Sequence, residues 1–148
     1  FNLDIVGGAV ASLCEVLRDS AVTMERGHMV NMMFDRQSEF LHLEAASDNT
    51  GLIATPIRSG PLWIRLPSWV DRTKLRVNGN AKFQIIKGYI LIAEPNLAEP
   101  VEITYPASES EIVLHHRTRE IRARLRGDTV VSMDNFGAEL TFFPPFND

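Results

Sequence analysis

The sequence predicts an all-β protein, an antiparallel β-sandwich of the jelly-roll type with one short N-terminal helix. Two observations favour this fold class. Apolar and polar residues alternate along most of the chain, as expected for strands with one buried and one solvated face. Turn-forming residues interrupt these runs at short intervals, as in hairpin-connected sheets. We therefore expect a single domain over residues 1–148, with strands distributed over residues 22–143.

The predicted helix covers residues 7–18. Val10, Leu13, Cys14 and Leu17 recur there at helical spacing and form an apolar stripe. This stripe needs cover, either from the sandwich or from a part that the chain lacks. Cys14 is the only cysteine, which excludes a disulfide framework and a cysteine-rich zinc site. On the stripe it is expected to be a small core residue.

The strands follow in order along the rest of the chain. The clearest alternating runs are residues 41–45, 62–66, 75–77, 101–105 and 121–126. With the turn signals between them, they predict about nine to eleven short strands.

The segment from Phe142 to Phe146 differs from these runs. It holds three aromatic residues and two prolines, and proline donates no hydrogen bond to a strand ladder. We expect it to lie over the sheet or to dock on a partner. Phe142, Phe143 and Phe146 are therefore candidate interface residues.

Arg122, Arg124 and Arg126 share one face of a predicted strand and form a second candidate interface. Like charges about 7 Å apart repel each other unless acidic groups lie opposite. In one interpretation, cross-strand acids such as Glu102 or Glu111 neutralise them. In the other, the arginines form a docking face for another domain or an acidic ligand.

Trp63, Trp69 and Tyr89 are the aromatic residues that can stack on sugar rings. Trp63 lies on the strand face opposite Leu62 and Ile64. The alternative for an exposed tryptophan is burial under a loop or a neighbouring domain. We treat the three aromatic residues as candidate carbohydrate-binding residues.

Composition and charge limit the partners. The chain is 45% hydrophobic and 23% charged, and its net charge of −4 argues against nucleic-acid binding. No apolar run is long enough to span a membrane, and residues 1–20 lack the features of a signal peptide. We expect no nucleic-acid or membrane partner. The compartment stays open, with the bacterial cytoplasm slightly favoured over secretion.

Direct signs of catalysis are weak. His115 and His116 are adjacent, so on a strand they point to opposite faces and do not converge on one metal ion. The chain has no G-x-S-x-G nucleophile motif, and no two carboxylates are marked as a facing pair. We assign no catalytic residue, no metal ligand and no cofactor.

Several segments together resemble one enzyme family. Gly60–Val70 (GPLWIRLPSWV), Leu75–Gly79 (LRVNG), Gly88–Leu91 (GYIL) and Val101–Pro106 (VEITYP) occur in the order found in bacterial β-L-arabinofuranosidase-like proteins of glycoside hydrolase family 127 and its relatives. The flanking segments Val30–Phe34 and Arg124–Val131 are also similar, so the resemblance runs from about residue 8 to residue 131.

The resemblance implies an α/α-barrel that carries the active site, followed by β-sandwich domains. This chain is similar to the final barrel helix plus a sandwich. The family's catalytic cysteine, held with other cysteines and a glutamate around zinc, would fall at or before Phe1-Asn2, where this chain has no cysteine. Cys14 does not match that position. The chain is then either an accessory portion of a larger hydrolase or a divergent branch without this chemistry.

We therefore expect an accessory β-sandwich domain, part of a larger parent protein and non-catalytic by itself, that packs on an α/α-barrel catalytic domain. The alternative is a free-standing module that binds carbohydrate or assembles with another copy of the chain. A third version has activity restored by a separately encoded barrel.

Overall fold

The computed structural model describes residues 3–78, 82–135 and 143–144. In this part of the chain, helix α1 (Leu3–Asp19) precedes a series of short strands. The strands are β1 (Ala21–Met24), β2 (Gly27–Val30), β3 (Arg36–Gln37), β4 (Leu41–Ala45), β5 (Gly51–Pro56), β6 (Leu62–Arg65), β7 (Arg76–Asn78), β8 (Phe83–Ile86), β9 (Tyr89–Ile92), β10 (Val101–Thr104), β11 (Glu109–His116), β12 (Arg119–Arg126) and β13 (Thr129–Met133).

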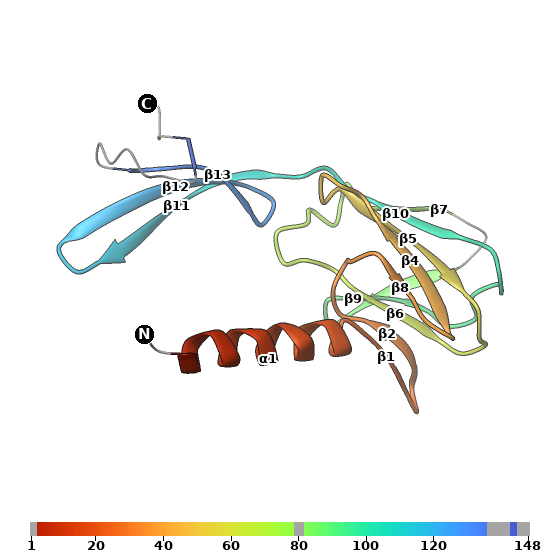
Figure 1. The fold of residues 1–148 in the computed structure, drawn as a ribbon. Coiled ribbons are helices and arrows are strands. Elements are labelled where there is room, and N and C mark those ends of the chain that lie inside the picture. The colour runs from red at the N-terminus through yellow and green to blue at the C-terminus, as the bar shows by residue number, and fades with distance from the viewer. Residues whose placement is uncertain (1–2, 79–81, 136–142, 145–148) are drawn as a thin grey trace.

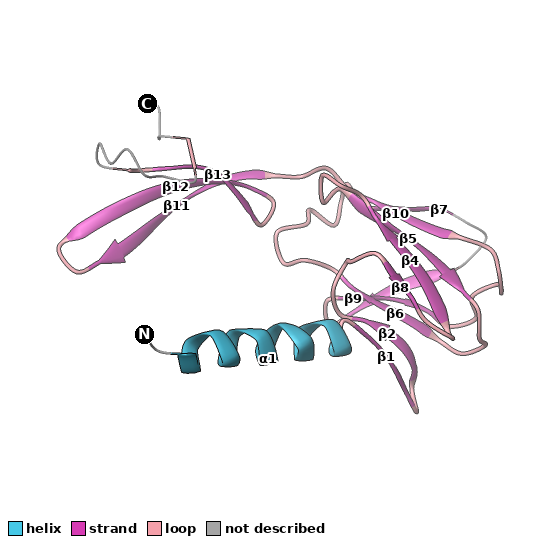
Figure 2. Ribbon diagram, viewed as in Figure 1, coloured by secondary structure: helices cyan, strands magenta, loops and turns pink. Residues whose placement is uncertain are grey.

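Ten of these strands build two five-stranded sheets that form the sandwich (Figures 1 and 2). The first sheet has the order β1-β2-β6-β9-β8 and the second the order β3-β4-β5-β10-β7. Neighbouring strands are antiparallel except β2 and β6, which run parallel with His28 opposite Leu62. The predicted antiparallel β-sandwich with one N-terminal helix is confirmed.

The core lies between the two sheets and follows the alternation seen in the sequence. Each of four central strands places two apolar side chains in it, and all of these side chains are almost fully buried. They are Leu41 and Leu43 on β4, Leu62 and Ile64 on β6, Ile90 and Ile92 on β9, and Val101 and Ile103 on β10. Burying one such side chain contributes about 1.5–3 kcal/mol, so this cluster is the main source of stability.

The helix is longer than predicted, and the described residues contain thirteen strands where about nine to eleven were expected. Helix α1 begins at Leu3 and ends at Asp19, so it contains the predicted helix over residues 7–18. Strands run from Ala21 to Met133. Among the described residues after Met133, none belongs to a strand. No helix in the described ranges is long and apolar enough to cross a membrane.

The last three strands form a separate sheet with the order β11-β12-β13. Figure 1 shows this sheet apart from the sandwich, on the side from which α1 also projects. All eight residues of β11 are exposed. The apolar side chains of Ile112, Val113 and Leu114 are 38%, 46% and 47% exposed. Within the described chain, β11 is therefore largely exposed to solvent and is not packed against the sandwich.

The third sheet is joined to the sandwich by contacts around Trp69. The Trp69 ring stands edge-on to Tyr105, with ring centroids 5.5 Å apart and an interplanar angle of 77°. Gly127, in the turn between β12 and β13, has a φ of +63° and lies against the indole. The Ser108 hydroxyl donates to the Trp69 carbonyl (3.2 Å), and the Gly127 amide donates to the Ser108 carbonyl (2.8 Å).

Tyr105 anchors this junction from the core side. It is 3% exposed, and its hydroxyl donates to the Met33 sulfur at 2.7 Å. Burial, with a smaller effect from the Asp128 carboxylate, raises the pKa of Tyr105 to about 12. The folded state therefore favours the neutral phenol.

Replacing Gly127 with alanine should loosen the junction. A Cβ atom there would lie 2.8 Å from Trp69 Cζ2, and the positive φ adds backbone strain. We expect the free energy of unfolding to fall by about 1–3 kcal/mol, measured by urea denaturation with tryptophan fluorescence. Gly88→Ala is the matched control, because Gly88 also has a positive φ (+83°) but nothing within 4 Å of its Cβ position. Equal losses in the two variants would contradict the packing role of Gly127.

Alkaline pH should destabilise the protein through Tyr105. The folded pKa of about 12 lies above the unfolded value near 10, so this contribution is complete below pH 10 and is lost as the pH rises towards 12. The expected loss is at most about 3 kcal/mol, measured as the change in urea midpoint between pH 9 and pH 11.5. Tyr105→Phe should show a shallower pH dependence over this window. The same slope in both proteins would argue against the shift.

Candidate functional site

A cavity of about 790 Å³ lies at one end of the sandwich, and we call it the end pocket. Its walls come from the segments that follow β2, β6 and β10, and from the β4–β5, β8–β9 and β12–β13 turns. In the first sheet, the C-terminal ends of β2 and β6 lie together because the two strands are parallel. The N-terminal end of β9 lies beside them, because β9 is antiparallel to β6. The volume falls in the range of about 300–1,000 Å³ that is typical of ligand pockets.

Aromatic rings line part of the end pocket. Trp69 and Tyr89 are half-buried in its wall, and Tyr105 is buried behind Trp69. The Tyr89 hydroxyl donates to Asn31 Oδ1 at 3.1 Å, and Asn31 Nδ2 donates to the Asp19 carbonyl at 2.9 Å. The position of Tyr89 is therefore linked to the end of α1.

Two of the three aromatic residues predicted to bind sugar come together at this pocket. Trp69 and Tyr89 line it, whereas Trp63 does not. Trp63 lies on the solvent side of its sheet, as expected, and packs edge-on against Tyr89 with ring centroids 6.4 Å apart. Its Nε1 donates to the Arg26 carbonyl at 3.0 Å. Trp63 thus supports Tyr89 from outside the pocket, and sugar stacking by these residues stays a prediction.

Three cations that sequence reasoning missed also line the end pocket. Arg65, Arg72 and Lys87 are exposed, and none of them forms an ion pair with another residue in the described part of the chain. Asp128 is the acidic residue in the wall, and Asn49 Nδ2 donates to its carboxylate at 3.4 Å. The wall therefore has an excess of positive charge, although the whole chain carries a net charge of −4.

One polar atom near the pocket lacks a partner. The Nε1 atom of Trp69 is buried and makes no hydrogen bond with the residues that the structure describes. An unpaired buried donor carries a desolvation cost of about 1–3 kcal/mol. The position of Trp69 is therefore set by ring packing and not by its polar group.

The arginine face is compensated within its own sheet. The register of β11 and β12 places Glu111 opposite Arg124, and Arg126 Nη2 lies 3.4 Å from Glu109 Oε1. These contacts support the first interpretation, in which cross-strand acids neutralise the arginines. The prediction of Glu102 as a partner for the arginines is wrong, because Glu102 lies on β10, in the second sheet of the sandwich.

Arg122, the third of these arginines, pairs with the acid that follows β13. Its Nε atom lies 3.4 Å from Asp134 Oδ2, and its amide nitrogen also donates to this carboxylate at 2.8 Å. In β10, Glu102 lies opposite Asn78 and accepts a hydrogen bond from its side chain at 3.2 Å. A docking role for the three arginines stays a prediction.

The aromatic tail is described in part. Phe142 and Phe146 lie outside the described residues, and Phe143 is half-buried. The Met133 amide donates to the Pro144 carbonyl at 3.0 Å, so the chain returns to the end of β13. An interface role for the three phenylalanines stays a prediction.

Cys14 is exposed, so its expected place in a core is wrong for this chain. The stripe on α1 that carries it has no cover from the sandwich, since α1 touches the sandwich at its C-terminal end. Among the described residues, no three histidine, cysteine, aspartate or glutamate side chains lie close enough together to hold a metal ion.

Comparison with solved structures relates the fold of this chain to part of a known enzyme. No protein-family profile matches the sequence, and no curated protein matches it either. Among solved structures, the chain is similar to a GH127 β-L-arabinofuranosidase from Geobacillus stearothermophilus T6, with a TM-score of 0.57 and 20% sequence identity. The similarity covers 80% of this chain and 22% of that enzyme's chain. The resemblance to glycoside hydrolase family 127 is thus confirmed as a shared fold with one part of a larger enzyme.

Proposed function

We propose that this chain is an accessory β-sandwich domain of a glycoside hydrolase and that it works by packing against an α/α-barrel catalytic domain. The fold shared with part of a GH127 enzyme supports the relationship to glycoside hydrolases. The packing role rests on a feature of this chain itself, the uncovered apolar stripe of α1.

The stripe of α1 is open to solvent. Val10, Leu13 and Leu17 lie on one face of the helix and are 54%, 68% and 58% exposed. Most of the stability of a helix in a protein comes from burying such an apolar face. Figure 1 shows α1 projecting away from the two large sheets. The stripe is therefore the part of the fold that most needs a partner.

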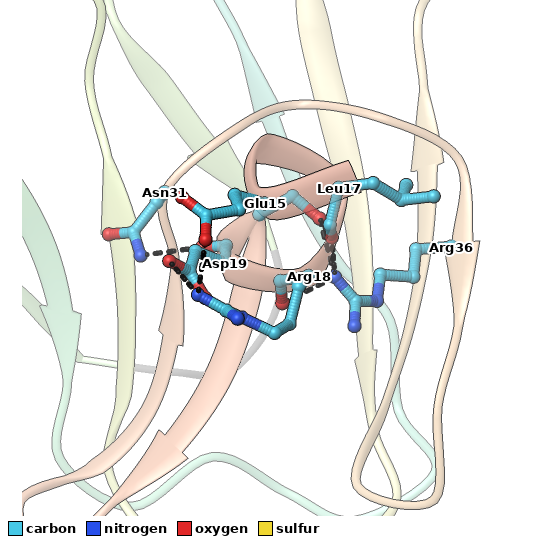
Figure 3. A network of polar contacts seen from close by, with 7 residues as sticks. Glu15, Leu17, Arg18, Asp19, Asn31 and Arg36 are labelled. Atoms are coloured by element: carbon cyan, nitrogen blue, oxygen red, sulfur yellow. Dashed lines mark hydrogen bonds and ion pairs between the residues drawn. The ribbon is translucent and has the colours of Figure 1, made fainter. Parts of the chain in front are cut away.

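The end of α1 is held firmly to the sandwich (Figure 3). The Arg36 guanidinium donates to the carbonyls of Leu17 and Arg18 and to the Ser20 hydroxyl. Ser20 is 1% exposed, and Asn31 adds a bond to the Asp19 carbonyl. A cation at a helix C-terminus satisfies free carbonyl groups and interacts favourably with the helix dipole. These bonds fix the orientation of α1, and therefore of its apolar stripe, relative to the sandwich.

The chemistry of the stripe suits a helical partner. Apolar side chains spaced three and four residues apart form ridges that fit the grooves of another helix. An α/α-barrel offers such grooves, and α1 would then complete the layer of helices next to the sandwich. No catalytic residue of this chain is needed for that role.

A second candidate function is carbohydrate binding by the sandwich itself. The end pocket favours it, because Trp69 and Tyr89 come together there with Asn31 in a cavity large enough for a short saccharide. The two functions use different parts of the chain. Packing is therefore measured by copurification, and carbohydrate binding by titration calorimetry.

The packing role predicts that charge on the stripe abolishes association. We expect the reading frame upstream of Phe1 to encode a helical-barrel region. This region, expressed as a separate polypeptide, should copurify with the 148-residue chain. The double variant Leu13→Glu/Leu17→Glu should lower the recovered complex at least tenfold, because it would bury two unpaired carboxylates.

Ile57→Glu is the matched control for this experiment. Ile57 is also an exposed apolar residue (51%), but it directly follows β5 and does not belong to α1. It should leave the complex intact, and circular dichroism should show that all variants keep their secondary structure. Undiminished copurification of the stripe variant would refute the packing role. A homodimer of the 148-residue chain that the same variant dissolves would favour the oligomerisation module instead.

A further inference from the structure

The charge around the end pocket indicates the kind of ligand that it accepts. Arg65, Arg72 and Lys87 come from three separate segments, the end of β6, the loop after it and the β8–β9 turn. Each is exposed and lacks an ion-pair partner within the described ranges. The three positive charges around the end pocket repel each other, and a bound anion would reduce this repulsion.

Two of these cations are neighbours of Tyr89 in the β6–β9 pair and the β8–β9 turn. Arg65 is the cross-strand partner of Tyr89 in the β6–β9 pair, so their side chains lie on the same face of the sheet. Lys87 precedes Tyr89 by two residues and has a φ of +48°, which belongs to the tight turn between β8 and β9. The Arg65 side chain therefore shares a sheet face with the half-buried Tyr89, and Lys87 lies in the turn that leads into Tyr89.

This combination matches a ligand with one apolar face and a carboxylate. Sugar rings stack their C–H faces on aromatic side chains, and arginine forms two-pronged hydrogen bonds with carboxylates. We infer that the end pocket binds an acidic saccharide, a short oligosaccharide that contains uronic acid. The inference rests on the second proposed function, carbohydrate binding, and adds its ligand class.

In this arrangement Tyr89 and Trp69 hold the ring, while Arg65 and Lys87 bind the carboxylate. Arg72 adds positive charge on the loop side. The bond from Tyr89 to Asn31 keeps the ring in place, since Asn31 is tied to the end of α1. The Tyr89 side chain is thus held in position before a ligand arrives.

The test compares two trimers of equal length, one of galacturonic acid and one of galactose, by titration calorimetry on the 148-residue chain. The acidic trimer should bind at least tenfold more tightly, and its affinity should fall severalfold between low and high salt. The double variant Arg65→Gln/Lys87→Gln should weaken it at least tenfold. Arg76→Gln/Lys82→Gln is the matched control, because both side chains are exposed and lie outside the pocket wall.

Each result supports or overturns a distinct statement. Equal binding of the neutral trimer, unchanged by Arg65→Gln/Lys87→Gln, would overturn the acidic ligand and leave carbohydrate binding standing. A glutamate tripeptide that displaces the acidic trimer at equal concentration would overturn the saccharide in favour of any carboxylate-bearing chain. Binding of neither trimer would overturn both the ligand class and carbohydrate binding. Packing on a barrel is measured separately by copurification and is not affected by these outcomes.

Discussion

Face-to-face packing of two five-stranded sheets is the interaction on which the rest of this protein depends. Leu43, Ile64, Ile90 and Ile103 are almost completely removed from water between the sheets, and no other part of the described chain has a comparable core. This packing aligns the ends of the central strands. The end pocket exists because loops and turns from both sheets must then emerge side by side.

Helix α1 and the third sheet stand outside that core. The helix is attached by Arg36, Ser20 and Asn31, and the sheet by the Trp69–Gly127 contact and the Asn49–Asp128 bond. Each element nevertheless leaves apolar residues in water. Contiguous uncovered apolar faces are typical of interaction sites. Both elements extend from the same side of the sandwich (Figure 2). A single large partner on that side would cover both, as the proposed packing on a catalytic domain implies.

The end pocket shows how strand alternation distributes chemistry as well as stability. Ile64 and Ile90 point into the core, so their neighbours Arg65 and Tyr89 must point away from it. At the ends of β6 and β9 these outward positions become pocket wall. A ligand site can therefore be built there without removing any apolar side chain from the core.

The sequence by itself predicted most of the secondary structure, because alternation with a period of two and the stripe at helical spacing are patterns within one short segment. It identified Trp69 and Tyr89, yet could not group them with Arg65, Arg72 and Lys87, which are brought together by strand pairing between distant segments. It also named Glu102 and Glu111 as partners for the arginines. Glu111 does lie opposite Arg124, but Glu109 and Asp134 are the partners of Arg126 and Arg122, and Glu102 belongs to another sheet. The tertiary structure alone decided these pairings and left Cys14 uncovered, because register and burial are properties of the whole packed chain and not of any one segment.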